Sequence, residues 1–416
     1  MKLLLKNVNA CLANEGFQNV DIEIIDGVYT QIGKIEISDH NRVIEKENLH
    51  CAPGFFDPFV NFGEPGFEHK EGLVSGCKAA AYGCFTQVAQ MPDTNPVIDN
   101  RPQVDFINSQ SKSLPVLVGA MPSFTKAQSV NELSEIGELA DAGVIAFSQL
   151  SNKVVKPSVL LKALEYAKAF NKKLVVHATD FELVPGAFIH EGITNVKIGM
   201  RGIPDFTEEL LVKKYVELLR YSGSSLHISG ISSQKSLAII EMAKSEGLNL
   251  TADTSVYNLI FTEDNLLDFD TNFKLNPPLR SVNDKDALID AVKSGVIDVV
   301  TSNHQPHEDD AKKLELETSE FGVIGVQTVF PALADTIGLS NAINILANRN
   351  RKTFDLDIPT IKVGNRANLS LFNPKSSWVF KVSNNLSKSQ NSMFINHEFM
   401  TKPLGIVNGL SLVINV

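Results

Sequence analysis

Eight short apolar runs, separated by stretches with helical periodicity, constrain the fold of this chain more than any other feature. Near-continuous apolar strands that alternate with helices are typical of a parallel sheet covered by helices on both faces. Eight strand–helix units predict a TIM-like (β/α)₈ barrel, an α/β fold that takes about 250 residues. The runs cover residues 54–61, 85–91, 115–121, 144–148, 174–177, 225–229, 248–254 and 296–303.

Three of the intervening segments carry helix signals. Residues 158–169 place their leucines and alanines on a broad apolar stripe. Acidic side chains open a second helix at Thr207, where the helix dipole favours negative charge, and Gly223 follows its end. A third helix is expected over residues 233–245. Residues 308–320 are polar and mostly acidic, and we expect an exposed, solvated connection there.

Both ends of the chain carry strand signals of a different kind. Residues 20–24 alternate apolar and polar side chains, and Asp26-Gly27 is a hairpin turn signal before the next strand. Strand signals return from about residue 360. We therefore predict three segments: residues 1–52 and 360–416, which together build a small β-sandwich domain, and residues 53–359, which form the barrel.

Composition excludes several classes of function. The net charge of −10 argues against nucleic acid or an anionic membrane as the main partner. The four cysteines include no CxxC pair, which fits a reducing compartment and argues against a thiolate zinc site. The first residues lack a signal-peptide core, and no apolar run approaches the roughly 18 residues of a membrane span. We expect a soluble, cytoplasmic protein.

The carboxyl ends of the strands are where chemistry sits in a barrel of this kind. The first run ends in Phe59 and Asn61, which stand two residues apart and so point to the same face. Two histidines at these positions would both face a metal ion. Phenylalanine has no donor atom, however, and asparagine offers only a weak neutral oxygen. The first strand therefore looks like a metal-binding strand without its ligands.

Several longer motifs resemble one known family. The chain is similar to the dihydroorotase branch of the metal-dependent amidohydrolases, and the similarity extends over nearly its whole length. The resemblance implies a TIM-like barrel with a small β domain, a zinc site and a place in pyrimidine biosynthesis. The motifs lie at residues 53–57, 64–70, 91–96, 272–280, 321–325 and 363–374.

At most positions where the family has catalytic groups, this chain has other residues. The resemblance assigns a His-x-His metal pair to the positions of Phe59 and Asn61, and the bridging metal ligand to the region of Gln149 and Leu150. The general base, an aspartate in the family, is Asn303 here, and an amide does not accept a proton near neutral pH. We therefore expect no catalytic residue.

The substrate side of the site is altered as well. The resemblance assigns an arginine that grips the substrate carboxylate to the position of Gly63. The second carboxylate anchor is an asparagine in the family and Asp93 here, whose negative charge would repel an anionic substrate. Asn276 and His307 match the substrate-contacting positions of the family.

His177 and His227 are the two residues that match the metal-histidine positions of the family. One interpretation is a vestigial metal site formed by the two histidines. The other, which we favour, is a pair of histidines hydrogen-bonded within a polar pocket. Two histidines and an asparagine fall short of the three strong protein ligands that a catalytic zinc needs, so we expect no cofactor.

Three hypotheses about function follow. The first is a catalytically inactive dihydroorotase-like protein, a pseudoenzyme that acts as a structural or regulatory partner of aspartate carbamoyltransferase and forms a homo-oligomer. The alternative is an active dihydroorotase or related cyclic amidohydrolase that uses zinc on a degenerate site to hydrolyse a ring C–N bond. The third is a binding protein that uses the emptied pocket for a different small molecule.

Overall fold

Eight parallel strands form the centre of the molecule. The computed structural model describes residues 2–12, 16–37, 39–40, 42–149 and 154–414. Each central strand overlaps one of the eight apolar runs, so the predicted parallel α/β core is confirmed. The strands are β6 (Phe55–Val60), β7 (Phe85–Gln90), β8 (Leu117–Ala120), β9 (Phe147–Gln149), β10 (Leu174–His177), β13 (Leu226–Ser229), β14 (Leu250–Ser255) and β15 (Val299–Thr301).

The central strands belong to two parallel sheets, a three-stranded one (β6-β7-β8) and a five-stranded one (β15-β14-β13-β10-β9). A single bridge joins the sheets at each side, Ser123 to Ser148 and Val60 to His304. At the second side the Asn61 N–H donates to the His304 carbonyl at 2.8 Å. Backbone pairing therefore gives two sheets linked by isolated bridges, and the closed eight-stranded barrel remains a prediction.

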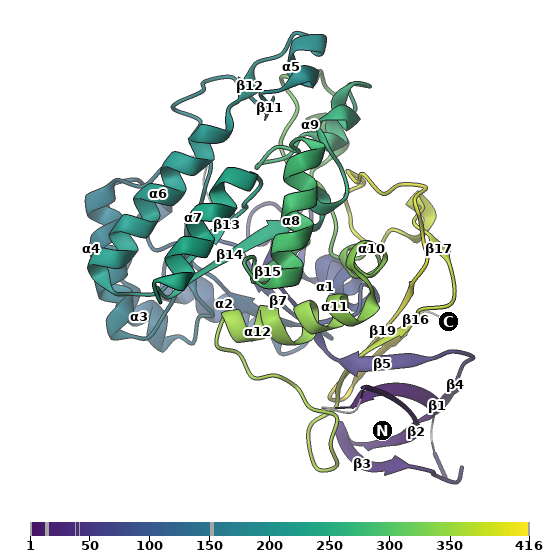
Figure 1. Cartoon of the computed structure of the whole chain (residues 1–416). Helices are drawn as coiled ribbons and strands as arrows, with labels where there is room; N and C mark the ends of the chain where they lie inside the picture. The colour runs from purple at the N-terminus through teal and green to yellow at the C-terminus, as the bar shows by residue number, and fades with distance from the viewer. Residues whose placement is uncertain (1, 13–15, 38, 41, 150–153, 415–416) are drawn as a thin grey trace.

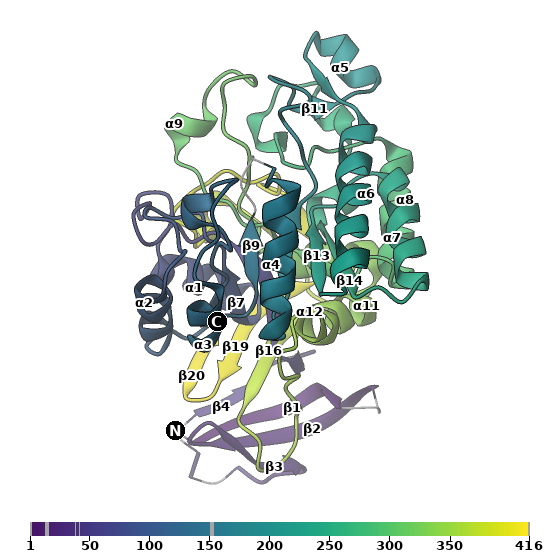
Figure 2. The ribbon, with the colours of Figure 1, turned by 90° about the vertical axis from the view of Figure 1, so that its left-hand side faces the viewer.

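Helices surround the strands (Figures 1 and 2). The three helices expected from the sequence are α4, α6 and α7, and Gly223 ends α6 in the left-handed conformation. The longer helices are α1 (Leu73–Tyr82), α2 (Arg101–Ser111), α3 (Ile136–Asp141), α4 (Pro157–Ala169), α6 (Asp205–Ser222), α7 (Gln234–Ser245), α8 (Val282–Ser294) and α10 (Val329–Ile337), followed by α11 (Leu339–Ile343) and α12 (Asn350–Thr353). No helix in the described part of the chain combines the length and the apolar character that crossing a bilayer requires.

Short elements gather at the end of the molecule opposite the terminal strands, at the top of Figure 1. They include the two-stranded pair β11 (Ile189–His190) and β12 (Gly202–Ile203), with α5 (Ile193–Ile198) between them and α9 (Asp309–Lys312) nearby. These elements belong to the loops that follow the carboxyl ends of the central strands. The loops thus provide material for a site at that end.

The connection over residues 308–320 is largely exposed, as its composition indicates, but buried lysines hold it to the rest of the molecule. Lys312 is 5% exposed, and its Nζ donates to the carbonyls of Thr271 at 2.7 Å and Glu320 at 2.8 Å. Lys274 Nζ donates to the carbonyls of Leu316 at 2.8 Å and Ser319 at 2.6 Å. Two buried ammonium groups therefore hold this connection by its backbone, a role that a charged side chain does not reveal in a sequence.

The two ends of the chain meet in one eight-stranded sheet with the order β20-β19-β16-β5-β1-β2-β3, in which β4 also pairs with β1. This confirms that the tail pairs with the N-terminal strands, and the β-sandwich arrangement of these strands remains a prediction. The domain boundaries remain a prediction. The strands are β1 (Lys2–Leu12), β2 (Gly16–Ile25), β3 (Val28–Gly33), β4 (Arg42–Glu45), β5 (His50–Pro53), β16 (Asn368–Asn373), β19 (Lys402–Asn408) and β20 (Ser411–Ile414), and β17 (Trp378–Val379) pairs with β18 (Glu398–Phe399) beside them.

The terminal sheet packs on the central strands through an aromatic contact. Phe372 of β16 lies 5.0 Å from the ring of Phe330 on α10 and 6.5 Å from the ring of Phe55 on β6, measured between centroids. All three side chains are fully buried. One apolar core therefore includes both the central strands and part of the terminal sheet.

Candidate functional site

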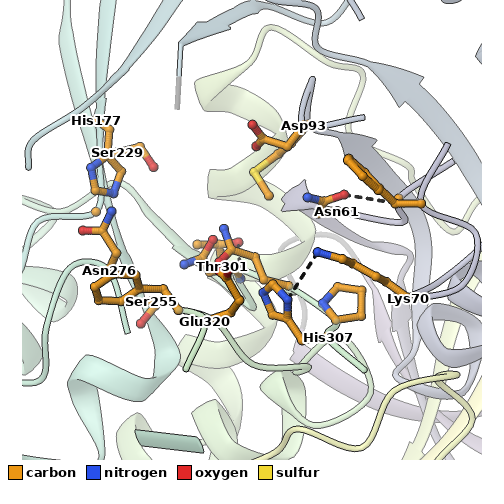
Figure 3. Close-up of a pocket in the computed structure, with 18 of the residues that line it drawn as sticks. Asn61, Lys70, Asp93, His177, Ser229, Ser255, Asn276, Thr301, His307 and Glu320 are labelled. Atoms are coloured by element: carbon orange, nitrogen blue, oxygen red, sulfur yellow. Dashed lines mark hydrogen bonds between the residues drawn. The ribbon is translucent and has the colours of Figure 1, made fainter. Parts of the chain in front are cut away.

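A cavity of about 500 Å³ opens at the carboxyl ends of the central strands (Figure 3). Its size lies within the range of small-molecule sites, which is about 300–1,000 Å³. Most of the residues on its wall have polar side chains, and they lie at or after the carboxyl ends of seven of the eight central strands. The polar side chains on the wall are those of Asn61, Lys70, Asp93, Gln128, His177, Ser229, Asp253, Ser255, Asn276, Thr301, Asn303, Gln305, His307 and Glu320.

His177 ends β10 and lies on the cavity wall. Its Nδ1 accepts a hydrogen bond from the Thr179 N–H at 3.2 Å. Burial lowers the pKa of His177 to about 4, although the charge of Asp253 and a hydrogen bond to the Asn276 backbone oppose the shift. The imidazole is therefore neutral at pH 7.

Gly230, the residue after β13, lies beside His177 on the cavity wall, which also includes Ser229 at the end of β13. A Cβ atom on Gly230 would lie 3.0 Å from His177 Nε2 and 3.0 Å from Pro277 Cδ, and its φ of +77° disfavours other residues. A side chain at this position would have to displace His177. The space next to the imidazole is thus kept free by a glycine.

His227 lies away from the cavity, in the interior beneath it. It is fully buried, with Nδ1 2.9 Å from Thr251 Oγ1 and Nε2 2.8 Å from Asp253 Oδ2. Its ring packs at 5.6 Å from Phe59 and 5.2 Å from Phe354. Both ring nitrogens therefore have partners within the protein, and His227 does not line the cavity on whose wall His177 lies.

Phe59 and Asn61 occupy different environments although they are two residues apart. Phe59 is 1% exposed and packs in an apolar cluster below the cavity with Phe56, Met91, Met121, Val175, Val299 and Phe354. Asn61 lies on the wall, and its Oδ1 accepts from the Gly63 N–H at 3.0 Å. Phe59 is thus part of the interior, whereas Asn61 faces the cavity.

Gly63 forms a tight turn on the wall with φ of +69°. A Cβ atom there would lie 2.8 Å from the Phe67 carbonyl oxygen and 3.2 Å from the Glu71 carbonyl oxygen. Contacts this short with backbone are not relieved by rotating a side chain. The position predicted to have lost an arginine now requires a glycine.

Gln149 is buried and does not lie on the cavity wall. Its Oε1 accepts from Thr125 Oγ1 at 2.6 Å and from Ser123 Oγ at 3.0 Å. Its Nε2 donates to the Gln128 carbonyl at 3.0 Å. The amide thus ties the end of β9 to the segment over residues 123–128. Leu150, the other candidate for this position, lies outside the described residues.

Asp93 is half-buried on the wall, and its Oδ1 accepts from Gln128 Nε2 at 2.6 Å. Burial raises the pKa of Asp93, while the hydrogen bond from Gln128 opposes the shift. Gln128 and the preceding Ala127 have φ of +51° and +48°. Sequence analysis did not single out Gln128, because two consecutive left-handed residues other than glycine leave no signal in a sequence.

The remaining candidates meet on the wall. Asn276, Asn303 and His307 all line the cavity, and Asn303 has φ of +42°. His307 Nδ1 lies 3.5 Å from Lys70 Nζ (Figure 3). Burial lowers the pKa of His307 to about 4, and the charge of Lys70 adds to the effect. Lys70 was not singled out as a functional residue, although it ends one of the family motifs.

The residues present do not fit a catalytic zinc ion. Phe59 offers no donor atom. The polar side-chain atoms of Gln149 and His227 form hydrogen bonds with other residues of the protein. Across the residues that the structure describes, no group of three or more His, Cys, Asp or Glu side chains could hold a metal ion. A catalytic zinc takes three such ligands.

Comparisons with known proteins agree with the fold and identify the family. Residues 50–236 match the family model described as dihydro-orotase-like. In solved structures, the chain resembles an L-hydantoinase (dihydropyrimidinase) from Arthrobacter aurescens, with a TM-score of 0.84 and 19% identity over 99% of this chain and 96% of that one. This likeness concerns the fold alone.

Curated relatives are closer in sequence. A dihydroorotase of Caldicellulosiruptor saccharolyticus is 35% identical over 94% of each chain. A dihydroorotase of Geobacter metallireducens is 34% identical over 96% of each chain. Similarity of this extent covers the central strands and the terminal sheet alike. The chain therefore belongs to the dihydroorotase family.

Proposed function

We propose that this member of the dihydroorotase family is catalytically inactive and acts as a structural or regulatory partner of aspartate carbamoyltransferase. One observation carries the first half of the proposal. Positions that the family resemblance assigns to metal ligands are built into the fold as structural residues, as Phe59 and Gln149 show. These two side chains have structural contacts, whereas Asn61 and His177, at two further such positions, lie on the cavity wall.

The substrate side of the cavity supports the same conclusion. Dihydroorotate is a carboxylate, and at Gly63 the turn leaves no room for a cationic side chain. Asp93 places a carboxyl group on the wall at the position of the second anchor. In a cavity partly shielded from water, two like charges repel each other more strongly than in bulk solvent. Neither of the two positions that the resemblance assigns to carboxylate anchors therefore offers a cation or a neutral donor to the carboxylate of an anionic ring.

The partnership with aspartate carbamoyltransferase rests on what the chain has kept. Identity of about a third with curated dihydroorotases extends over nearly the whole length, although the chemistry of the cavity differs. Retention of a framework without its reactive groups supports a role for the outer surface. The retained framework also supports a homo-oligomer of this chain. It likewise supports a closed ring of eight central strands, joined through the Ser123–Ser148 and Val60–His304 bridges.

The first test measures zinc and turnover in one sample. The purified chain should contain zinc well below one ion per chain and should neither cyclise carbamoyl aspartate nor hydrolyse dihydroorotate above background. The Geobacter metallireducens relative, prepared identically, is the positive control for both assays. Stoichiometric zinc with turnover would overturn the proposal and establish the alternative, an active cyclic amidohydrolase.

The second test concerns the partner. The chain should co-elute with the aspartate carbamoyltransferase of its own organism in size-exclusion chromatography and should change the aspartate saturation curve of that enzyme. Bovine serum albumin in place of the chain controls for non-specific effects. Strictly separate elution at micromolar concentrations, with an unchanged curve, would remove the second half of the proposal.

A further inference from the structure

Two opposite charges on the cavity wall have no ionic partner among the described residues. Lys70 Nζ lies 3.5 Å from His307 Nδ1, and His307 is neutral at pH 7. The same ammonium lies 5.2 Å from the centre of the Phe67 ring. Asp93 accepts from the neutral amide of Gln128. Uncompensated charges in a partly buried site are costly unless a partner arrives.

A strained turn brings Gln128 to Asp93. Ala127 and Gln128 both adopt positive φ. The turn is held by Asp99 Oδ2, which accepts from the Ala127 N–H at 2.6 Å, and by Gln149, which donates to the Gln128 carbonyl at 3.0 Å. Backbone strain of this kind persists where the surroundings impose it, and it is frequent at ligand sites.

The strained turn also leaves an acceptor unused. Gln128 Oε1 is buried and has no hydrogen-bond partner within the described part of the chain. Buried polar atoms without partners are uncommon in native structures. Together with the Asp93 carboxylate, this oxygen forms a pair of acceptors suited to an ammonium group.

Donors lie on the same side of the cavity. Figure 3 shows Asn61 between Asp93 and Lys70, with its amide nitrogen directed into the cavity. Asn61 Oδ1 accepts a hydrogen bond from the Gly63 N–H. This bond fixes the orientation of the side-chain amide, with Nδ2 pointing into the cavity. Lys70 and Asn61 thus offer a charged and a neutral donor, which suits a carboxylate.

We propose that the cavity binds a small zwitterion of the amino-acid class. The ammonium group of the ligand contacts Asp93 and Gln128 Oε1, and its carboxylate contacts Lys70 and Asn61. A volume of about 500 Å³ accommodates a free amino acid. The inference goes beyond the proposed function, because a chain that acts through its surface needs no ligand in the cavity.

The first experiment uses the unaltered chain. Isothermal titration calorimetry with each of the common amino acids should identify at least one that binds at millimolar concentration or tighter. The amide of that amino acid, which lacks the carboxylate, and its N-acetyl derivative, which lacks the ammonium, should each bind at least about tenfold more weakly. No binding by any amino acid, or equal binding of a derivative, would overturn the proposal.

The second experiment uses matched variants. Asp93→Asn keeps an oxygen for Gln128 and removes the charge, and Lys70→Gln removes the cation; each should weaken binding at least about tenfold. Lys313→Gln changes an exposed lysine that pairs with Asp309 outside the cavity wall, and it should bind as the unaltered chain does. Unchanged affinity in both cavity variants would contradict the proposal. If a variant fails to fold, the binding of the amide and N-acetyl derivatives to the unaltered chain tests the proposal instead.

Binding and turnover are measured separately, so the two proposals can fail independently. An amino acid that binds to a chain without turnover supports both. Turnover of dihydroorotate by a chain that binds no amino acid would remove both. Dihydroorotate itself, a single anion without an ammonium group, should not displace the bound amino acid.

Discussion

At the scale of the residue, the candidate site contains two kinds of side chain, those held by many contacts within the protein and those that face the cavity. Phe59, Gln149 and His227 each have a full set of apolar or hydrogen-bonded contacts. Asp93 and Lys70 have no ionic partner among the described residues, yet both face the cavity. Side chains that contribute to folding and side chains that remain available for a ligand are thus clearly separated.

Replacing Phe59 with histidine should destabilise the fold. Phe59→His replaces a buried ring in an apolar cluster with a polar one, and we expect a loss of about 3 kcal/mol in the free energy of unfolding. Urea denaturation followed by circular dichroism measures the loss. Phe206→His, at a residue that is 50% exposed on α6, is the control and should change stability little. Equal effects of the two changes would contradict the packing described here.

Removing the charge of Asp93 should stabilise the chain without ligand. Burial raises the pKa of Asp93 above its usual 3.8, so the folded state binds this proton more tightly than the unfolded state does. The carboxylate therefore costs stability above its raised pKa, and the cost disappears as the pH falls toward 3.8.

Asp93→Asn should consequently be more stable than the unaltered chain at pH 8, and the difference should shrink as the pH falls. Thermal unfolding across a pH series measures it. Asp309→Asn, at an exposed acid of the connection beyond β15, controls for the general effect of removing a negative charge. A difference that grows on acidification would show that Asp93 stabilises the fold.

At the scale of the element, the connection over residues 308–322 is held by lysines that donate to backbone carbonyls. Burial lowers the pKa of Lys312 to about 8, which is the effect expected for an ammonium group removed from water. Because Glu320 and Phe321 lie on the cavity wall, the anchoring of this connection also shapes the site.

Lys312→Met should loosen this connection while leaving the central strands intact. The change removes a donor from the carbonyls of Thr271 and Glu320, and hydrogen bonds of a charged donor are worth about 1.5–3 kcal/mol. Amide hydrogen exchange in residues 308–322 should therefore become roughly tenfold faster or more. Lys313→Met is the matched control, because Lys313 is the exposed neighbour. Unchanged exchange in Lys312→Met would show that other contacts hold the segment.

The elements that sequence predicts well are those with a simple pattern. Burial on both faces makes each central strand a continuous apolar run, and the turn at Asp26-Gly27 shows positive φ at both residues, as its composition indicates. The exposure of the connection over residues 308–320 was predicted from its composition, but its anchoring by Lys312 and Lys274 was not, because a buried lysine cannot be told from a solvated one in a sequence. The orientation of the His227 side chain and the conformation of the turn at Gln128 depend on contacts with residues distant in sequence. No local sequence pattern therefore predicts them.

At the scale of the whole molecule, the terminal sheet and the central strands share one core. Strand β16 pairs with β5 from the other end of the chain and with β19, and Phe372 on it packs against β6 and α10. We therefore expect the two parts to unfold together.

Phe372→Ala should lower the stability of both parts at once. Removing a buried phenylalanine costs about 3–5 kcal/mol, and differential scanning calorimetry should still show a single transition at a lower temperature. Leu410→Ala, at the exposed turn between β19 and β20, should leave that temperature nearly unchanged. Two separate transitions in the unaltered chain would contradict a shared core.

The turn at Gly63 limits which side chains this position can accept. A Cβ atom at this position meets the carbonyl oxygens of Phe67 and Glu71, so a single substitution that reintroduces arginine is opposed by the backbone itself. The loop would have to move before a larger side chain could be accommodated at this position. A cationic anchor at Gly63 therefore requires a rearrangement of the backbone between Gly63 and Glu71 together with the substitution itself.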